Sequence, residues 1–272
     1  MSDTHFHAIP TAPGHHVLQG ASCRLLGFEK LVLLPGQAHS GQVAGDREQM
    51  LVVLSGTAEA VEVAGGPRFA NVGGRANVFV GNPHSVYLPR GSRFTVTAGS
   101  RFEAALVSAP SSLDTEAYEV RPEAVRTGTW GTLNYTRHFR EILTQPDGRP
   151  ASSLIVGETI TPSGNWSTFP PHKHEREDGK GGEVFHEEMY YFRVASPEGF
   201  GLARHFSPEH GFDHTHTVRD DSLLSIPYGY HTYAAAPGAK SYYLWFLAGD
   251  GRRQGVALQP ELAWTQKLVG MC

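Results

Sequence analysis

The sequence predicts an all-β protein built from two similar halves. Short runs of β-branched and aromatic residues recur along the chain, each bounded by Gly, Pro, Asp or Asn, and such spacing is typical of a β-sandwich or barrel. Patterns with a helical period are scarce. The stretches 86–96 and 224–234 share a Pro-x-Gly turn followed by a β-run, which indicates an internal duplication.

Strands are expected in two groups, and the 272 residues suffice for two compact domains. The first group lies at 29–36, 49–56, 76–81, 85–91, 93–99 and 103–110. The second group lies at 152–164, 188–199, 200–209, 214–229 and 241–251. The polar stretch between the groups resembles a linker, so we expect an N-terminal domain at 1–115, a connecting segment at 116–150 and a C-terminal domain at 151–272.

Composition excludes several classes of protein. The net charge is −4, with 23 basic and 27 acidic residues, whereas a nucleic-acid surface needs clustered Lys and Arg. No apolar run is long enough to span a membrane, and the N-terminal residues do not have the pattern of a signal peptide. The two cysteines, Cys23 and Cys272, do not suggest a disulfide framework. We expect a cytoplasmic protein with no nucleic-acid or membrane partner.

Histidine is concentrated in one region, since eight of the 15 histidines fall between His172 and His231. Within the motif PPHKHE (170–175), His172 and His174 are two residues apart. Side chains at such a spacing on a strand project to the same face, so one metal ion can bind both imidazoles. Lys173 has the opposite parity and is expected to point away.

A carboxylate and a third imidazole complete a candidate metal site. A charged, Gly-rich loop separates His174 from a strand that opens at Glu188, and either Glu187 or Glu188 faces the histidines, depending on the parity of that strand. Glu183 is a third candidate. In IPYGYH (226–231), a Pro-x-Gly turn leads into a strand that begins near His231. Three nitrogens and one oxygen suit a divalent first-row ion and leave coordination positions open.

The first half has no equivalent set. His39 has no partner two residues away, and the stretch after the Pro-x-Gly turn at 89–91 contains no histidine. We therefore expect the N-terminal domain to lack a metal site.

The spacing of these residues resembles the cupin metal motif, in which HxH and Glu lie on one hairpin and a further His follows a Pro-x-Gly turn. The resemblance implies two tandem cupin barrels of the jelly-roll type, a bicupin. It also favours Glu188 as the ligand, because family members place it just before the x-Tyr/Phe run. The chain departs from the motif in the 13 residues that separate His174 from Glu188, a gap much longer than usual.

Several longer stretches resemble the bacterial 5-deoxy-glucuronate isomerase family of myo-inositol catabolism, namely 157–175, 187–201 and 226–252, with LSGTAEA, GGRANVFVG and VYLPRGS in the first half. The resemblance implies conversion of 5-deoxy-D-glucuronate to 5-dehydro-2-deoxy-D-gluconate. This aldose–ketose isomerisation moves a proton between C2 and C1 through a cis-enediolate, and a divalent ion, zinc or manganese, can stabilise the developing charge.

Such a reaction needs a proton shuttle and a cation for the substrate carboxylate. We expect Glu187 or Glu183 to move the proton. We expect Arg193, Arg204 and Tyr190 to bind the substrate, since they lie in strands that follow the ligand carboxylate. The partner is then a small sugar acid, and exposed β-edges predict a homo-oligomer. Two alternatives remain, a metal-dependent cupin dioxygenase and a non-enzymatic cupin that binds sugar acids.

Overall fold

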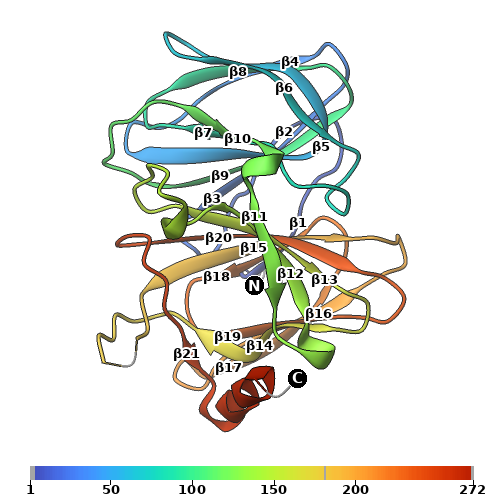
Figure 1. Ribbon diagram of the computed structural model, residues 1–272, viewed down its shortest axis with the longest axis vertical. Coiled ribbons are helices and arrows are strands. Elements are labelled where there is room, and N and C mark those ends of the chain that lie inside the picture. The colour runs from blue at the N-terminus through green and yellow to red at the C-terminus, as the bar shows by residue number, and fades with distance from the viewer. Residues whose placement is uncertain (1–3, 181, 271–272) are drawn as a thin grey trace.

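The computed structural model describes residues 4–180 and 182–270, and its two β-structures are stacked along the long axis of the molecule (Figure 1). The first half contains a sheet with the strand order β10-β7-β5-β9-β3-β2. The long strand β5 (Arg47–Val63) continues into a second layer, where it pairs with β6 and β8. The other strands are β2 (Gly14–Val17), β3 (Gly27–Leu33), β4 (Ala38–Gln42), β6 (Arg68–Arg75), β7 (Ser85–Leu88), β8 (Arg93–Ala98), β9 (Phe102–Pro110) and β10 (Tyr118–Val120).

The second half repeats this two-layer arrangement. One sheet has the order β1-β18-β15-β20-β13-β12-β11 and the other has the order β17-β16-β19-β14-β21. Their bounds are β1 (Phe6–Ala8), β11 (Arg126–Trp130), β12 (Arg137–Leu143), β13 (Ile155–Thr161), β14 (Trp166–Lys173), β15 (His186–Val194), β16 (Gly201–Ser207), β17 (Phe212–Val218), β18 (Ser222–Ile226), β19 (Tyr230–Ala235), β20 (Ser241–Gly249) and β21 (Ala257–Leu258). Four 3₁₀ helices complete the description: η1 (Pro122–Ala124), η2 (Leu133–Tyr135), η3 (Gln145–Asp147) and η4 (Pro260–Gly270). The all-β expectation is confirmed.

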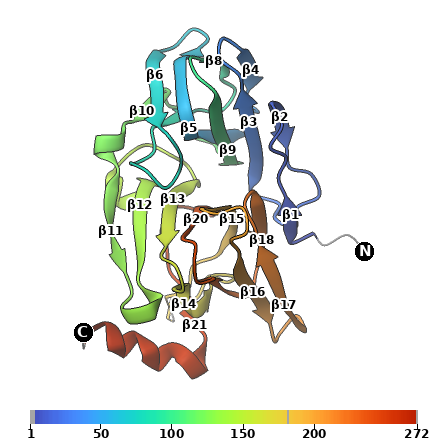
Figure 2. The ribbon, with the colours of Figure 1, turned by 90° about the vertical axis from the view of Figure 1, so that its right-hand side faces the viewer.

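Some segments of the chain pair with strands of the other half, an arrangement that the expected domain limits did not anticipate. The N-terminal strand β1 pairs with β18 of the second half (Figure 2). The segment 116–150, expected to be a linker, instead contributes β10 to the first half and the edge strands β11 and β12 to the second. Its polar composition reflects the exposed side chains of an edge hairpin, because β11 has no buried residue.

The largest apolar cluster lies between the halves and holds their inner sheets together. It contains Met50 and Val52 from β5 together with Met189 and Tyr191 from β15. The alternate residues of both strands face the interior of their own half, as Tyr190 does in the second. Both faces of these strands are therefore buried, which is why they read as continuous apolar runs in the sequence.

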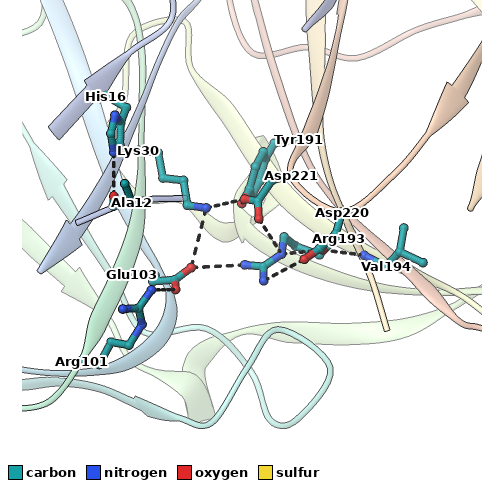
Figure 3. Close-up of polar contacts among 10 residues, drawn as sticks. All are labelled: Ala12, His16, Lys30, Arg101, Glu103, Tyr191, Arg193, Val194, Asp220 and Asp221. Carbon is teal, nitrogen blue, oxygen red and sulfur yellow. Dashed lines mark hydrogen bonds and ion pairs between the residues drawn. The ribbon is translucent and has the colours of Figure 1, made fainter. Parts of the chain in front are cut away.

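Buried charges cross the interface as well (Figure 3). The fully buried Lys30 of β3 forms an ion pair with Asp221 of the second half, and the hydroxyl of Tyr191 also donates to that carboxylate. Arg193 Nε lies 2.8 Å from Asp220 Oδ1, and its Nη1 lies 3.4 Å from Glu103 Oε2 of the first half. Each of these ions has an opposite charge nearby, as burial requires.

The strand registers reveal corresponding positions in the two halves. In the first half, Lys30 of β3 is paired with Ala105 of β9, which is paired in turn with Val52 of β5. In the second half, Glu158 of β13 is paired with Leu244 of β20, which is paired in turn with Tyr191 of β15. Glu158 is likewise fully buried and pairs across the interface, with Arg75 Nη2 2.6 Å from its Oε1.

The first carboxylates of β5 and β15 also correspond, and each holds a loop of the opposite half. Glu48 accepts hydrogen bonds from the amides of residues 152–154 at 2.7–2.8 Å. Glu187 accepts them from the amides of Arg24 and Leu25 at 2.8 and 2.7 Å.

Candidate metal centre

Three neighbouring segments of the second half bring three histidines and one glutamate together. His172 lies near the end of β14 and is paired in register with His231 of β19. His174 follows β14, and Glu188 lies on β15 with the parity of Tyr190, whose side chain faces the interior of this half. One ligand atom from each of the four residues lies within 4.8 Å of the others. No other such group is found within 4–180 and 182–270.

The donor atoms point at a common centre. His174 Nε2 and His231 Nε2 each lie 3.1 Å from Glu188 Oε2. Neither ring nitrogen of His231 has a partner in hydrogen-bond geometry among the described residues, although the residue is fully buried. His174 Nδ1 lies 2.7 Å from the carbonyl oxygen of His186, and a proton on Nδ1 leaves Nε2 free as a ligand. Orphaned buried nitrogens around a carboxylate fit a divalent ion.

Electrostatics favour the metal-binding forms of Glu188 and His172, whereas in the absence of an ion Glu188 outweighs burial and raises the pKa of His174. Burial would raise the pKa of Glu188, but the hydrogen bond from His174 and the proximity of His231 outweigh it and hold the pKa well below the usual range. Burial, together with the neighbouring His231 and His174, lowers the pKa of His172 well below its usual value. An ionised carboxylate and a neutral imidazole are the ligand forms that a metal ion requires.

A cavity of about 440 Å³ opens onto this centre, a size suited to a small molecule. His172, His174 and Glu188 line it on one side. Its apolar walls come from rings and aliphatic side chains, namely Trp130, Tyr135, Phe169, Pro170, Tyr190, Tyr243, Trp245, Leu247, Val256 and Leu258. Gln266 and Val269 of the helix η4 also line it, so this helix forms part of the cavity wall.

The two glutamates expected to shuttle the proton lie outside this lining. Glu187 has the parity that faces the first half, and its carboxylate is bound to the Arg24 and Leu25 amides described above. Glu183 Oε1 accepts from the backbone amides of Glu175 and Arg176 at 2.7 and 3.2 Å. Both carboxylates therefore hold loops in place, and neither belongs to the described residues that line the cavity.

The expected substrate residues divide in the same way. Tyr190 lines the cavity, and its ring centroid lies 5.6 Å from that of His231. Arg193 has the parity of Tyr191 and lies at the interface between the halves. Arg204 is 42% exposed on β16 and forms an ion pair with Asp213 at 2.6 Å. Neither arginine belongs to the described residues that line the cavity, and both are engaged in ion pairs elsewhere.

Other cavity residues were missed because their segment was assigned to a linker. Trp130 and Arg137 belong to the hairpin of β11 and β12, which lies at the edge of the sheet that carries Glu188. The stretch TRHFREIL (136–143) gave no clear strand signal, because its apolar residues Phe139, Ile142 and Leu143 do not alternate.

Comparison with known proteins gives consistent matches over nearly the whole chain. The family model described as KduI/IolB family matches residues 11–265. A 5-deoxy-glucuronate isomerase of Geobacillus kaustophilus is 34% identical over 243 residues, which cover 89% of this chain and 86% of the relative. One of Shouchella clausii is 38% identical over 225 residues, which cover 82% and 81%.

Solved structures agree with the fold. An IolB-like protein from Salmonella typhimurium LT2 has a TM-score of 0.90 and 29% identity, and the match covers 97% of this chain and 100% of that one. Oxalate decarboxylase from Lactobacillus farciminis has a TM-score of 0.66 at 9% identity, over 96% and 90% of the two chains. The latter likeness concerns the fold alone, and the expected bicupin architecture is confirmed.

Proposed function

The chain belongs to the KduI/IolB family, and on that premise we propose that it is a divalent-metal-dependent 5-deoxy-glucuronate isomerase. The observation that carries the proposal is the convergence of His172, His174, Glu188 and His231 on one side of a cavity of substrate size. We propose these four residues as the metal ligands.

The bound ion would supply a Lewis acid for the oxygens at C1 and C2 of the open-chain sugar, which makes the C2 proton easier to remove. The chain's own residues would hold the sugar between aromatic walls and reduce its contact with water. Burial and the nearby Glu188 raise the pKa of Tyr190 well above its usual value, so its hydroxyl stays protonated and can donate a hydrogen bond to a substrate oxygen.

The finer assignments are proposals as well. Zinc or manganese fits a ligand set of three imidazoles and one carboxylate in a reaction without electron transfer. We propose that the enzyme serves myo-inositol catabolism in the cytoplasm as a homo-oligomer, which light scattering on the purified protein would test. No helix within 4–180 and 182–270 is long and apolar enough to cross a membrane.

Metal analysis tests the site. Purified protein should contain roughly one divalent ion per chain, and His172→Ala or His231→Ala should lose most of it. His214→Ala is the matched control, because His214 is exposed on β17, outside the cluster. Equal metal content in wild type and both ligand variants would reject the proposed centre.

NMR in deuterated water tests the reaction. 5-Deoxy-glucuronate should convert to the ketose under nitrogen, and the label at the new methylene reports whether the transferred proton exchanges with solvent. A dioxygenase would consume oxygen and stop under nitrogen. A binding protein would retain the substrate unchanged. Either result with metal-loaded wild type would reject the isomerase.

A further inference from the structure

One cation in the cavity has no counterion among the described residues. Arg137 is the only lysine or arginine among the described residues that line it. Its Nε is buried without a hydrogen-bond partner in the described part of the chain. Its one hydrogen bond there is a long one, 3.4 Å from Nη1 to the carbonyl oxygen of Tyr135. Arg137 is half-buried, and a charge that is partly removed from water is costly unless something pairs with it.

The other arginines of the second half that were considered for substrate binding are already paired. Arg193 contacts Asp220 and Glu103, and Arg204 contacts Asp213. Burial lowers the pKa of Arg137, and the neighbouring Tyr243, Tyr190 and Tyr135 offset this lowering only in part. A guanidinium fork of this kind matches the geometry of a carboxylate.

Local structure holds the guanidinium in place. Arg137 begins β12 and is paired with Trp130 of β11, and its Cζ lies 5.7 Å from the centre of that indole ring. Gly131 follows with a φ of +78°, and a Cβ there would lie 2.2 Å from the carbonyl oxygen of Tyr135 and 2.8 Å from Arg137 Nη1. The glycine therefore allows the turn to pass close to both Tyr135 and the arginine head group.

The position also suits a ligand that reaches the metal centre. Tyr190 stacks near Tyr243, with 4.5 Å between ring centroids, and near His231. Arg137, both tyrosines, His172 and His174 all line the same cavity, so the arginine and these histidines face one common space. A six-carbon acid extends about 6 Å from C1 to its carboxyl carbon, since a C–C bond is about 1.5 Å long.

We propose that Arg137 binds the carboxylate of the substrate and makes the site specific for sugar acids over neutral sugars. This inference rests on the proposed isomerase function. The sugar is then held at two ends, by the metal centre at C1 and C2 and by the guanidinium at the acid group.

Steady-state kinetics of Arg137→Gln and Arg137→Lys test the assignment. Loss of a bidentate charged pair should raise KM for 5-deoxy-glucuronate about 100-fold. The value of kcat should change much less if the contact stabilises the bound substrate and the transition state equally. Lysine should restore part of the loss, because it keeps the charge without the fork. Arg204→Gln should behave like wild type. A KM within threefold of wild type for Arg137→Gln would overturn the proposal.

Two further measurements test the role of Arg137 separately from the proposed isomerase activity. Titration calorimetry with metal-loaded protein should show that wild type binds D-glucuronate more tightly than D-glucose and that Arg137→Gln loses the preference. An unchanged preference would reject the role of Arg137, even if the wild type does not isomerise. Thermal unfolding of the ligand-free variant should occur at the wild-type temperature or above, because an unpaired cation has been removed. A large loss of stability would indicate a structural residue instead.

Discussion

Replacement of Lys30 by Met tests the buried charges between the halves. Lys30 is fully buried, and its Nζ pairs with Asp221 and lies 3.7 Å from Glu103 Oε2. Methionine has a similar length and no charge, so the substitution removes the ion pair without opening a large cavity. Asp221 then keeps only the hydroxyl of Tyr191 and, at 3.8 Å, Arg193 Nε.

The magnitude follows from the partners that remain. Removing one member of a buried pair costs about 3–5 kcal/mol, and the residual contacts of Asp221 place the loss near the lower end, at about 3 kcal/mol. For a chain of this size, such a loss lowers the melting temperature by about 6 °C. Arg68→Met is the matched control, because Arg68 pairs with Glu62 on the surface, where both side chains are at least half exposed. Its free energy of unfolding should change by less than about 1 kcal/mol.

Urea titration of metal-loaded protein measures these free energies of unfolding. The double variant with Asp221→Asn completes a cycle, and asparagine tolerates the positive φ of +56° at this position. The coupling energy should be about 2 kcal/mol, within the range for residues in contact. A loss below about 0.5 kcal/mol for Lys30→Met, or additive losses in the cycle, would show that the pair does not stabilise the interface.

Three other outcomes are expected. Chelation should lower the melting temperature, and excess zinc should restore it, because an ion at 100 times its Kd stabilises by about 2.7 kcal/mol; equal temperatures would argue against a metal in the folded centre. Glu187→Gln should lose about 1–2 kcal/mol of stability and keep its metal, whereas Glu188→Gln should lose the metal. Metal loss in the Glu187 variant and retention in the Glu188 variant would exchange their roles. Burial lowers the pKa of His205 to about 3, so between about pH 6.5 and pH 3 the unfolded state binds more protons and stability falls as the pH drops. The free energy of unfolding at pH 5 should be lower by about 2 kcal/mol than at pH 7. His205→Gln should flatten this pH dependence if His205 is responsible.

The two-layer β fold and three of the four proposed ligands followed from local patterns. His172 and His174 share a strand face, and His231 follows a Pro-x-Gly turn, so neither inference needed tertiary information. The parity of Glu187 and Glu188 could not be read from the residues, because both faces of β15 are buried and apolar residues occupy both. The cupin resemblance supplied the choice of Glu188, and the structure supplies its physical reason, since the other face of the strand packs against the first half.

The substrate residues were harder to predict. Arg193 and Arg204 were chosen for their position after the ligand carboxylate, but their partners lie elsewhere in the chain and are not visible in sequence. Arg137 lies in a polar edge hairpin, which resembles a linker when its pairing with β13 is unknown. What distinguishes Arg137 is its place in a cavity without an anionic partner among the described residues, and only tertiary structure reveals this.

The opposite charges of Lys30 and Glu158 bear on how the two halves could have diverged. An isologous dimer of identical half-chains would carry the same residue at both symmetry-related positions. Here the corresponding positions carry opposite signs, and each meets a complementary ion of the other half. Two identical C-terminal halves would bury two Glu158 carboxylates without Arg75 to meet them. The two halves thus form an asymmetric pair, in which β15 carries Glu188, the carboxylate of the candidate metal centre, while β5 carries the neutral Gln49 at the matching place.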